Sequence, residues 1–213
     1  MHRPGDTVHT ALGSLTVMHL LGRGKSGYAY RAEGGTGAVL YKRMHAEPNP
    51  FYRFDDNKVD LEVAAYQRLV DAGIPTPRLL DHNREAGYLV RTLYPQPTAA
   101  EVLAAGADPE PLLPALFAMA TRLRDRGMNI DWFPTNFIAI GGELVYIDYE
   151  TNPYDPHWSL EQWGLFYWAN GEGLRRFLDT GDATAINADL DRGRPIMAPF
   201  RDRVAEWIAA YGE

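Results

Sequence analysis

The fold is decided by two stretches of sequence, Asn129-Ile130-Asp131-Trp132-Phe133-Pro134-Thr135-Asn136 and Leu144-Val145-Tyr146-Ile147-Asp148-Tyr149-Glu150. Asp131 precedes Asn136 by five residues, and Asp148 ends an apolar run that is typical of a buried strand. Carboxylate and amide oxygens are hard ligands of the kind that Mg²⁺ prefers. The two stretches therefore predict a polar loop and a hairpin, with a metal-binding aspartate where the hairpin ends.

A glycine pattern lies between two predicted strands in the first part of the chain. Gly22-Arg23-Gly24-Lys25-Ser26-Gly27 is a G-x-G-x-x-G, which alone is a weak signal because turns use glycine for many reasons. A dinucleotide-binding loop needs a helix directly after its last glycine, whereas residues 28–32 indicate a strand. A Walker A loop needs a glycine where His19 stands. The pattern therefore indicates a glycine hairpin, either a plain one or one that covers phosphates.

A lysine and an acidic helix follow this hairpin. Lys42 lies on the predicted strand 38–43, where a charge can reach the phosphates under a glycine hairpin. Glu62, near the start of the predicted helix 58–72, is the candidate carboxylate that pairs with Lys42, and Asp60 is a nearby alternative. The simpler interpretation is a solvated lysine and two first-turn acids that the helix dipole favours.

The order of the predicted elements indicates an α+β protein. The first part predicts a five-stranded antiparallel sheet with one helix, and the part after Pro95 and Pro97 is mainly helical. Thr98 and Glu101 form a capping box that opens a short helix. The predicted strands are 15–21, 28–32, 38–43, 78–81, 88–93, 137–140 and 144–147, and the predicted helices are 58–72, 109–126, 159–169, 173–179 and 199–211.

Taken in order, these motifs resemble the protein-kinase-like superfamily over about residues 21–150. The resemblance implies a bilobal fold, with an N-lobe at 1–93 and a minimal C-lobe at 94–213. It also implies an ATP-dependent phosphotransferase that uses Mg²⁺. Asp131 would orient or deprotonate the acceptor hydroxyl, and Lys42, paired with Glu62, would contact phosphate. Asn136 and Asp148 would be the metal ligands.

The resemblance also places the nucleotide. The glycine hairpin would cover the phosphates, and the adenine would lie against the segment after the strand 88–93. Arg91 is unusual at this position, and an alternative is that its side chain points to solvent. The candidate nucleotide-binding residues are Gly22, Gly24, Gly27, Lys42, Arg91, Thr92, Leu93 and Tyr94.

The sequence departs from protein kinases in ways that bear on the acceptor. Asn129-Ile130-Asp131 replaces H-R-D, so the arginine that reads an activation-loop phosphate is missing, and Phe133 stands at the position of the catalytic-loop lysine. Asp148-Tyr149-Glu150 looks like the matching segment of choline-kinase-like and aminoglycoside-phosphotransferase-like enzymes, and no A-P-E segment follows. A small-molecule or chain-end hydroxyl is therefore favoured. The alternatives are a compact serine/threonine kinase similar to the RIO and Bud32 groups, and an ATP-binding pseudokinase or scaffold.

Composition sets limits on the partners. The 213 residues are 46% hydrophobic with a net charge of -7 and no cysteine, which argues against a nucleic-acid partner and excludes disulfides and thiolate metal sites. The first residues lack the apolar region of a signal peptide, and the longest apolar stretch, 112–120, is too short to span a membrane. We therefore expect a cytoplasmic protein whose partners are ATP and a hydroxyl-bearing substrate, with no membrane partner.

An aromatic run follows the second decisive stretch. Core packing is favoured for it over an aromatic substrate wall, because part of the run follows helical spacing. Asp155 or Glu161 is expected to brace the catalytic loop, and the sequence does not choose between them. The run consists of Trp158, Leu160, Trp163, Tyr167 and Trp168.

Overall fold

The computed structural model describes residues 1–35, 37–47 and 56–212. Its secondary structure is mixed α and β, with one larger antiparallel sheet, several helices and three small strand pairs, as the sequence predicts for the class. Within the described residues, no helix is long and apolar enough to cross a membrane.

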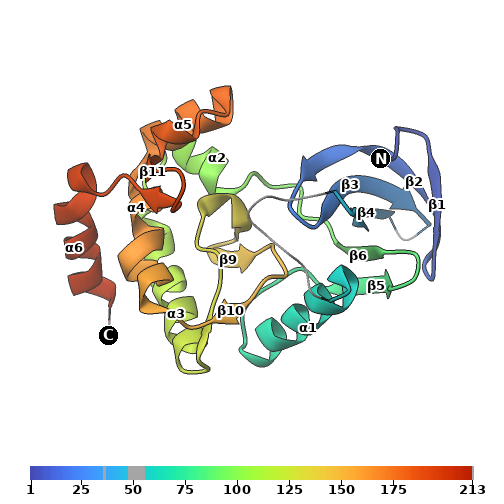
Figure 1. Cartoon of the computed structure of the whole chain (residues 1–213), viewed down its shortest axis with the longest axis horizontal. Helices are drawn as coiled ribbons and strands as arrows, with labels where there is room; N and C mark the ends of the chain where they lie inside the picture. Colours follow the sequence, from blue (N-terminus) through green and yellow to red (C-terminus); the bar gives the residue numbers. More distant parts are fainter. Residues whose placement is uncertain (36, 48–55, 213) are drawn as a thin grey trace. The chain divides into compact units, whose positions relative to one another are not determined.

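The chain forms two compact units. Unit 1 comprises Met1–Gln67 and Pro77–Pro95, and unit 2 comprises Arg68–Thr76 and Gln96–Glu213. The assignment of a nucleotide-binding lobe at 1–93 and a catalytic lobe at 94–213 stays a prediction. Figure 1 labels helices and strands of both units.

The larger sheet lies in unit 1 and is entirely antiparallel in the order β1-β2-β3-β4-β6-β5. The prediction of five strands is wrong, because the described residues form six. The extra strand, β1 (Thr7–Thr10), pairs with the start of β2 and buries only Val8, so its short polar sequence carries no clear apolar alternation. The other strands are β2 (Gly13–Arg23), β3 (Gly27–Gly34), β4 (Gly37–Met44), β5 (Leu79–Asn83) and β6 (Tyr88–Thr92).

Strand alternation sorts the side chains of this sheet into two faces. Tyr30 is paired with Tyr41, which places both on one face, and Lys42 is paired with Leu89 on the opposite face. Helix α1 (Lys58–Asp71) supplies Glu62 to the Lys42 face. The first face forms a core of Val8, Leu15, Val17, Tyr28, Tyr30, Ala32, Val39, Tyr41, Tyr88 and Val90.

Tyr88, in the core on the first face of the sheet, leads to a prediction about the stability of the protein at alkaline pH. Burial and a 3.0 Å hydrogen bond to Asp81 raise the pKa of Tyr88 to about 12, above its ordinary 10.0. The unfolded chain therefore loses this proton first, so the stabilisation is complete below pH 10 and is lost between pH 10 and 12. Urea unfolding followed by circular dichroism should show a shallower decline over this range in Tyr88→Phe than in wild type. Equal declines would contradict the assignment, and Tyr154→Phe is the control.

Unit 2 contains the remaining helices. The capping box predicted at Thr98 and Glu101 is confirmed, because Thr98 accepts from the Glu101 backbone and Glu101 accepts from the Thr98 backbone. Helix α5 (Gly171–Thr180) is capped at its C-terminal end by Gly181, whose φ of 72° is the left-handed conformation that glycine adopts readily. The helices are α2 (Ala99–Ala104), α3 (Leu113–Arg124), α4 (Leu165–Ala169), α5 (Gly171–Thr180) and α6 (Arg201–Tyr211).

Three short strand pairs complete unit 2. The predicted hairpin is present as β8 (Phe137–Ile140) and β9 (Glu143–Tyr146), joined by Gly141 and Gly142 with positive φ. The other strands are β7 (Met128–Asn129) with β10 (Asn152–Pro153), and β11 (Asn187–Asp189) with β12 (Arg194–Pro195). Short helical turns lie at η1 (Glu110–Leu112), η2 (Pro134–Asn136), η3 (Pro156–Trp158), η5 (Ala183–Ala185) and η6 (Ala198–Phe200).

The predicted helix 159–169 is not a single α-helix. Residues Leu160–Gly164 form a π-helix, η4, before α4 begins. Leu160, Tyr167 and Trp168 are buried, which agrees with core packing, whereas Trp158 is 42% exposed. Single-turn π-helices are frequent near functional sites, and the sequence gives no signal for them.

Candidate functional site

A buried ion pair lies on the face of the unit 1 sheet opposite the tyrosines. The Lys42 Nζ is 2.6 Å from Glu62 Oε1, and the two side chains are 11% and 9% exposed. The predicted partner is therefore Glu62. Asp60, the alternative, instead contacts Arg84 at 3.1 Å. The simpler interpretation of a solvated lysine is wrong, although the role of the pair in phosphate binding stays a prediction.

The glycine pattern forms the predicted hairpin between β2 and β3. The turn closes by a 2.9 Å hydrogen bond from Gly24 N to Gly27 O. A Cβ on Gly27 would meet Arg43 O at 2.6 Å, so the backbones of β3 and β4 approach too closely for a side chain there. No Cβ contact closer than 3.9 Å constrains Gly22 or Gly24. Of the three glycines, only Gly27 is therefore required by packing.

The predicted nucleotide-contacting segment lies at the end of β6. Arg91 is paired with Leu40 across the ladder, which places it on the same face as Lys42. It is 7% exposed, so the alternative that it points to solvent is wrong. Thr92 donates its backbone N–H to Arg78 O at 3.0 Å, and Leu93 and Tyr94 follow as half-buried residues. Adenine binding by this segment stays a prediction.

A second lysine lies close to the pair. Lys58, one turn before Glu62 on α1, donates to His45 O at 2.6 Å. Burial lowers the pKa of Lys58, Lys42 adds to the lowering, and Glu62 opposes it. The fields of Lys42 and Glu62 therefore both reach Lys58, which lies beside the ion pair.

The predicted catalytic loop in unit 2 is held by its own backbone. Asp131 Oδ1 accepts from Phe133 N at 3.0 Å, and Asn136 Nδ2 donates to Asp131 O at 3.3 Å. Asn136 O in turn accepts from Ile147 N at 2.8 Å, which ties the loop to the residue before Asp148. These bonds hold Asp131 and Asn136 in one compact turn, joined to the segment that carries Asp148.

A buried tyrosine, Tyr146, lies within the electrostatic field of three acids of this region. Burial raises the pKa of Tyr146 well above its ordinary 10.0, and the charges of Asp148, Asp131 and Glu150 raise it further. The Tyr146 hydroxyl donates to Glu150 O at 3.3 Å. The charges of Asp131, Asp148 and Glu150 therefore all act on this one buried phenol.

Asn129 anchors the predicted catalytic loop. Its Nδ2 donates to Trp158 O at 2.9 Å and to Asp155 O at 3.3 Å, and its Oδ1 accepts from Trp132 Nε1 at 3.0 Å. Trp168 Nε1 donates to Trp132 O at 2.9 Å. Of the two expected braces, Asp155 thus acts through its carbonyl. The other, Glu161, contacts Arg124 at 3.2 Å.

The π-helix η4 packs against Trp132, whose Nε1 donates to Asn129. A Cβ on Gly164 would lie 2.5 Å from Trp132 Cβ and 3.1 Å from its Cγ. We predict that Gly164→Ala lowers the free energy of unfolding by about 1–3 kcal/mol, the usual cost of overpacking. Tryptophan fluorescence during urea unfolding measures this. An unchanged unfolding midpoint would contradict the tight contact with Trp132.

The metal prediction rests on oxygen ligands. Among residues 1–35, 37–47 and 56–212, no three His, Asp or Glu side chains are placed to hold a metal ion. Mg²⁺ commonly takes only one or two protein carboxylates and completes its shell with water and phosphate oxygens. Asn136 and Asp148 fit that smaller set. Their role as ligands stays a prediction.

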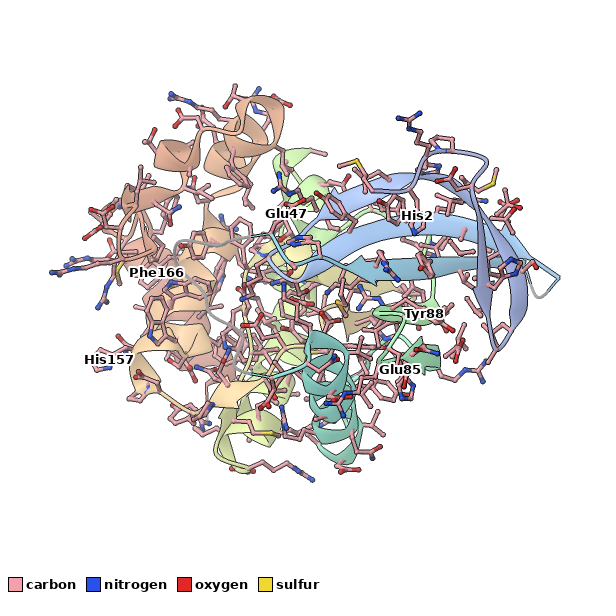
Figure 2. The ribbon with its side chains drawn as sticks, turned by 45° about the vertical axis from the view of Figure 1, so that its right-hand side comes forward. His2, Glu47, Glu85, Tyr88, His157 and Phe166 are labelled. Carbon is pink, nitrogen blue, oxygen red and sulfur yellow. The ribbon has the colours of Figure 1, made fainter. Side chains whose placement is uncertain are left out.

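Sequence reasoning missed the groups that support these side chains. Ser26 donates to Glu62 Oε1 at 2.7 Å, and Tyr146, Trp132 and Trp168 build the surroundings of Asp131. Ser26 lies inside the glycine pattern, so its position was visible, but its partner is 36 residues away in sequence. His157, by contrast, lies at the outer edge of unit 2 and is 72% exposed (Figure 2).

Comparisons with known proteins show little sequence similarity to this chain. No protein-family model matches the chain. No curated protein matches it either. Among solved structures, the chain is similar to one described as the structure of vaccinia related kinase 3, with a TM-score of 0.46 and 13% identity, over 73% of this chain and 54% of that chain. The chain thus spans about half the length of that structure, and what it binds must be inferred from its own side chains.

Proposed function

We propose that this protein is an ATP-dependent phosphotransferase that moves the γ-phosphate of MgATP to a hydroxyl group. The observation that carries the proposal is the buried pair of Lys42 and Glu62. Burying two charges costs free energy that their mutual attraction often does not offset, so the pair is weak evidence for added stability and marks a candidate functional site. A lysine held by a carboxylate beside a glycine hairpin is the arrangement that contacts nucleotide phosphates.

Unit 2 supplies the complementary chemistry in the proposal. Asp131 orients the acceptor hydroxyl and accepts its proton, while Asn136 and Asp148 hold Mg²⁺. When bound, the metal neutralises charge on the phosphate oxygens. Phosphoryl transfer leaves little covalent work for the protein, so positioning and charge account for most of the rate. The hydrogen bonds that hold Asp131 and Asn136 in one turn support this assignment.

The favoured acceptor is a small molecule or the hydroxyl at a chain end. Only residues 151–159 separate the Asp148 segment from the π-helix, which leaves no room for an extended peptide platform. A compact serine/threonine kinase is the second candidate. An ATP-binding pseudokinase or scaffold is the third, favoured by Phe133 in place of the catalytic-loop lysine.

Transfer from γ-labelled ATP tests these candidates. Purified protein and Mg²⁺ are incubated with three acceptors, namely the protein itself, mixed cell protein and a panel of small hydroxyl compounds. Label in a small compound supports the favoured acceptor, and label in cell protein supports the protein kinase. Binding of MgATP without transfer to any acceptor supports the pseudokinase, and no binding contradicts the proposal.

A further inference from the structure

The glycine hairpin of unit 1 is tied to helix α1 by one buried hydroxyl. Ser26 Oγ donates to Glu62 Oε1 at 2.7 Å, and Lys42 Nζ donates to the same oxygen at 2.6 Å. All three residues are at most 8% exposed. One carboxylate oxygen thus joins the hairpin, the strand of Lys42 and the helix.

The other oxygen of this carboxylate makes the hydroxyl more important. Glu62 Oε2 is buried and has no hydrogen-bond partner among the described residues. Ser26 and Lys42 therefore both donate to the other oxygen, Oε1, and hold the carboxylate between them. Hydrogen bonds to a buried charge are stronger than hydrogen bonds between neutral groups. Loss of Ser26 Oγ therefore removes one of the two strong hydrogen bonds that orient the Glu62 carboxylate.

The backbone of the hairpin is held at the same point. His45 N donates to Ser26 O at 3.2 Å. His45 Nδ1 accepts from Glu47 N at 3.2 Å, so Nε2 carries the hydrogen that faces Gly24 O at 3.1 Å. Glu47 in turn accepts from Arg23, and Figure 2 labels it. Both the main chain and the side chain of Ser26 are therefore fixed.

We propose that Ser26 is a positioning residue that fastens the glycine hairpin to Glu62 and so assembles the Lys42 site before nucleotide arrives. The inference rests on the proposed function, because it assigns the site to MgATP. A site ordered in advance spends less binding free energy on fixing a loop and a lysine. Ser26 should therefore matter for nucleotide affinity more than for turnover, since bound phosphates themselves hold Lys42 once they are present.

Three variants test this. Ser26→Ala removes the hydroxyl, and Ser26→Thr keeps it. Ser14→Ala is the control, since Ser14 Oγ is exposed and forms a hydrogen bond with His9 Nδ1. We expect Ser26→Ala to raise the KM for MgATP about tenfold, the equivalent of about 1.4 kcal/mol, with kcat within about twofold because chemistry is untouched. Ser26→Thr should recover most of the affinity, and Ser14→Ala should match wild type.

Hydrogen exchange without nucleotide separates this inference from the proposed function. We expect the amides of residues 22–27 to exchange faster in Ser26→Ala than in wild type, and Ser26→Thr to restore protection. Unchanged exchange in Ser26→Ala would overturn the fastening itself, whether or not the protein binds ATP. Faster exchange in a protein that does not bind MgATP would support the fastening and refute its assignment to nucleotide. Faster exchange with an unchanged KM would overturn the role in affinity.

Discussion

Replacing Asp131 with asparagine should abolish phosphate transfer while leaving MgATP binding intact. Asparagine keeps an Oδ1 that accepts from Phe133 N, so the turn that ends at Asn136 should keep its shape. What is lost is the group that accepts the hydroxyl proton, and such a loss typically costs about 10²–10⁴ in rate. Transfer from γ-labelled ATP measures the rate, and thermal stabilisation by MgATP measures binding.

The control for this variant is Asp179→Asn. Asp179 is an exposed residue of α5. Its replacement by asparagine removes one carboxylate charge, as Asp131→Asn does, but leaves the Asp131 loop unchanged. Asp131→Asn should also leave the unfolding temperature close to that of wild type, because the amide oxygen keeps the bond from Phe133 N that holds the turn. Equal transfer by wild type and Asp131→Asn would exclude Asp131 as the base.

Removing one partner of the buried ion pair should strongly destabilise the protein, and removing both charges should restore much of the loss. Lys42→Met leaves the Glu62 carboxylate buried, with the neutral hydroxyl of Ser26 as its donor among the described residues. An uncompensated buried charge costs about 3–5 kcal/mol. Glu62→Gln, added to Lys42→Met, removes the remaining charge and keeps an acceptor for Ser26.

Urea unfolding of the two single variants and the double variant measures this coupling. Each single variant should unfold at lower urea than the double variant, which gives a coupling free energy that survives high salt because the pair is buried. Arg84→Ala, which breaks the exposed contact with Asp60, is the control and should change stability little. Additive effects of Lys42→Met and Glu62→Gln would contradict a coupled pair.

Local patterns predicted most of the sheet in unit 1, because alternation identifies strands such as β4 and β6. The pairing of Lys42 with Glu62 was expected from the order of the kinase-like motifs, which left Asp60 as an alternative, and the structure decides for Glu62. The capping box at Thr98 and the turn at Gly141 are equally local, because each depends on neighbours within three residues.

What the sequence could not predict depends on distant contacts. Strand β1 is short and polar, and it forms because β2 offers it an edge. The π-helix at Leu160–Gly164 fits around Trp132, about thirty residues earlier, and no local pattern encodes that contact. The bond between Ser26 and Glu62 is of the same kind, since a serine in a glycine pattern is otherwise an ordinary turn residue.

We propose that the buried pair of Lys42 and Glu62 belongs to a site for the phosphates of ATP. Calorimetric titration of MgATP into wild type and into the Lys42→Met, Glu62→Gln double variant tests it most directly, because the double variant should stay folded without the charges. We expect saturable binding by wild type and at least about tenfold weaker binding by the double variant. No binding by wild type, or equal binding by both proteins, would contradict it.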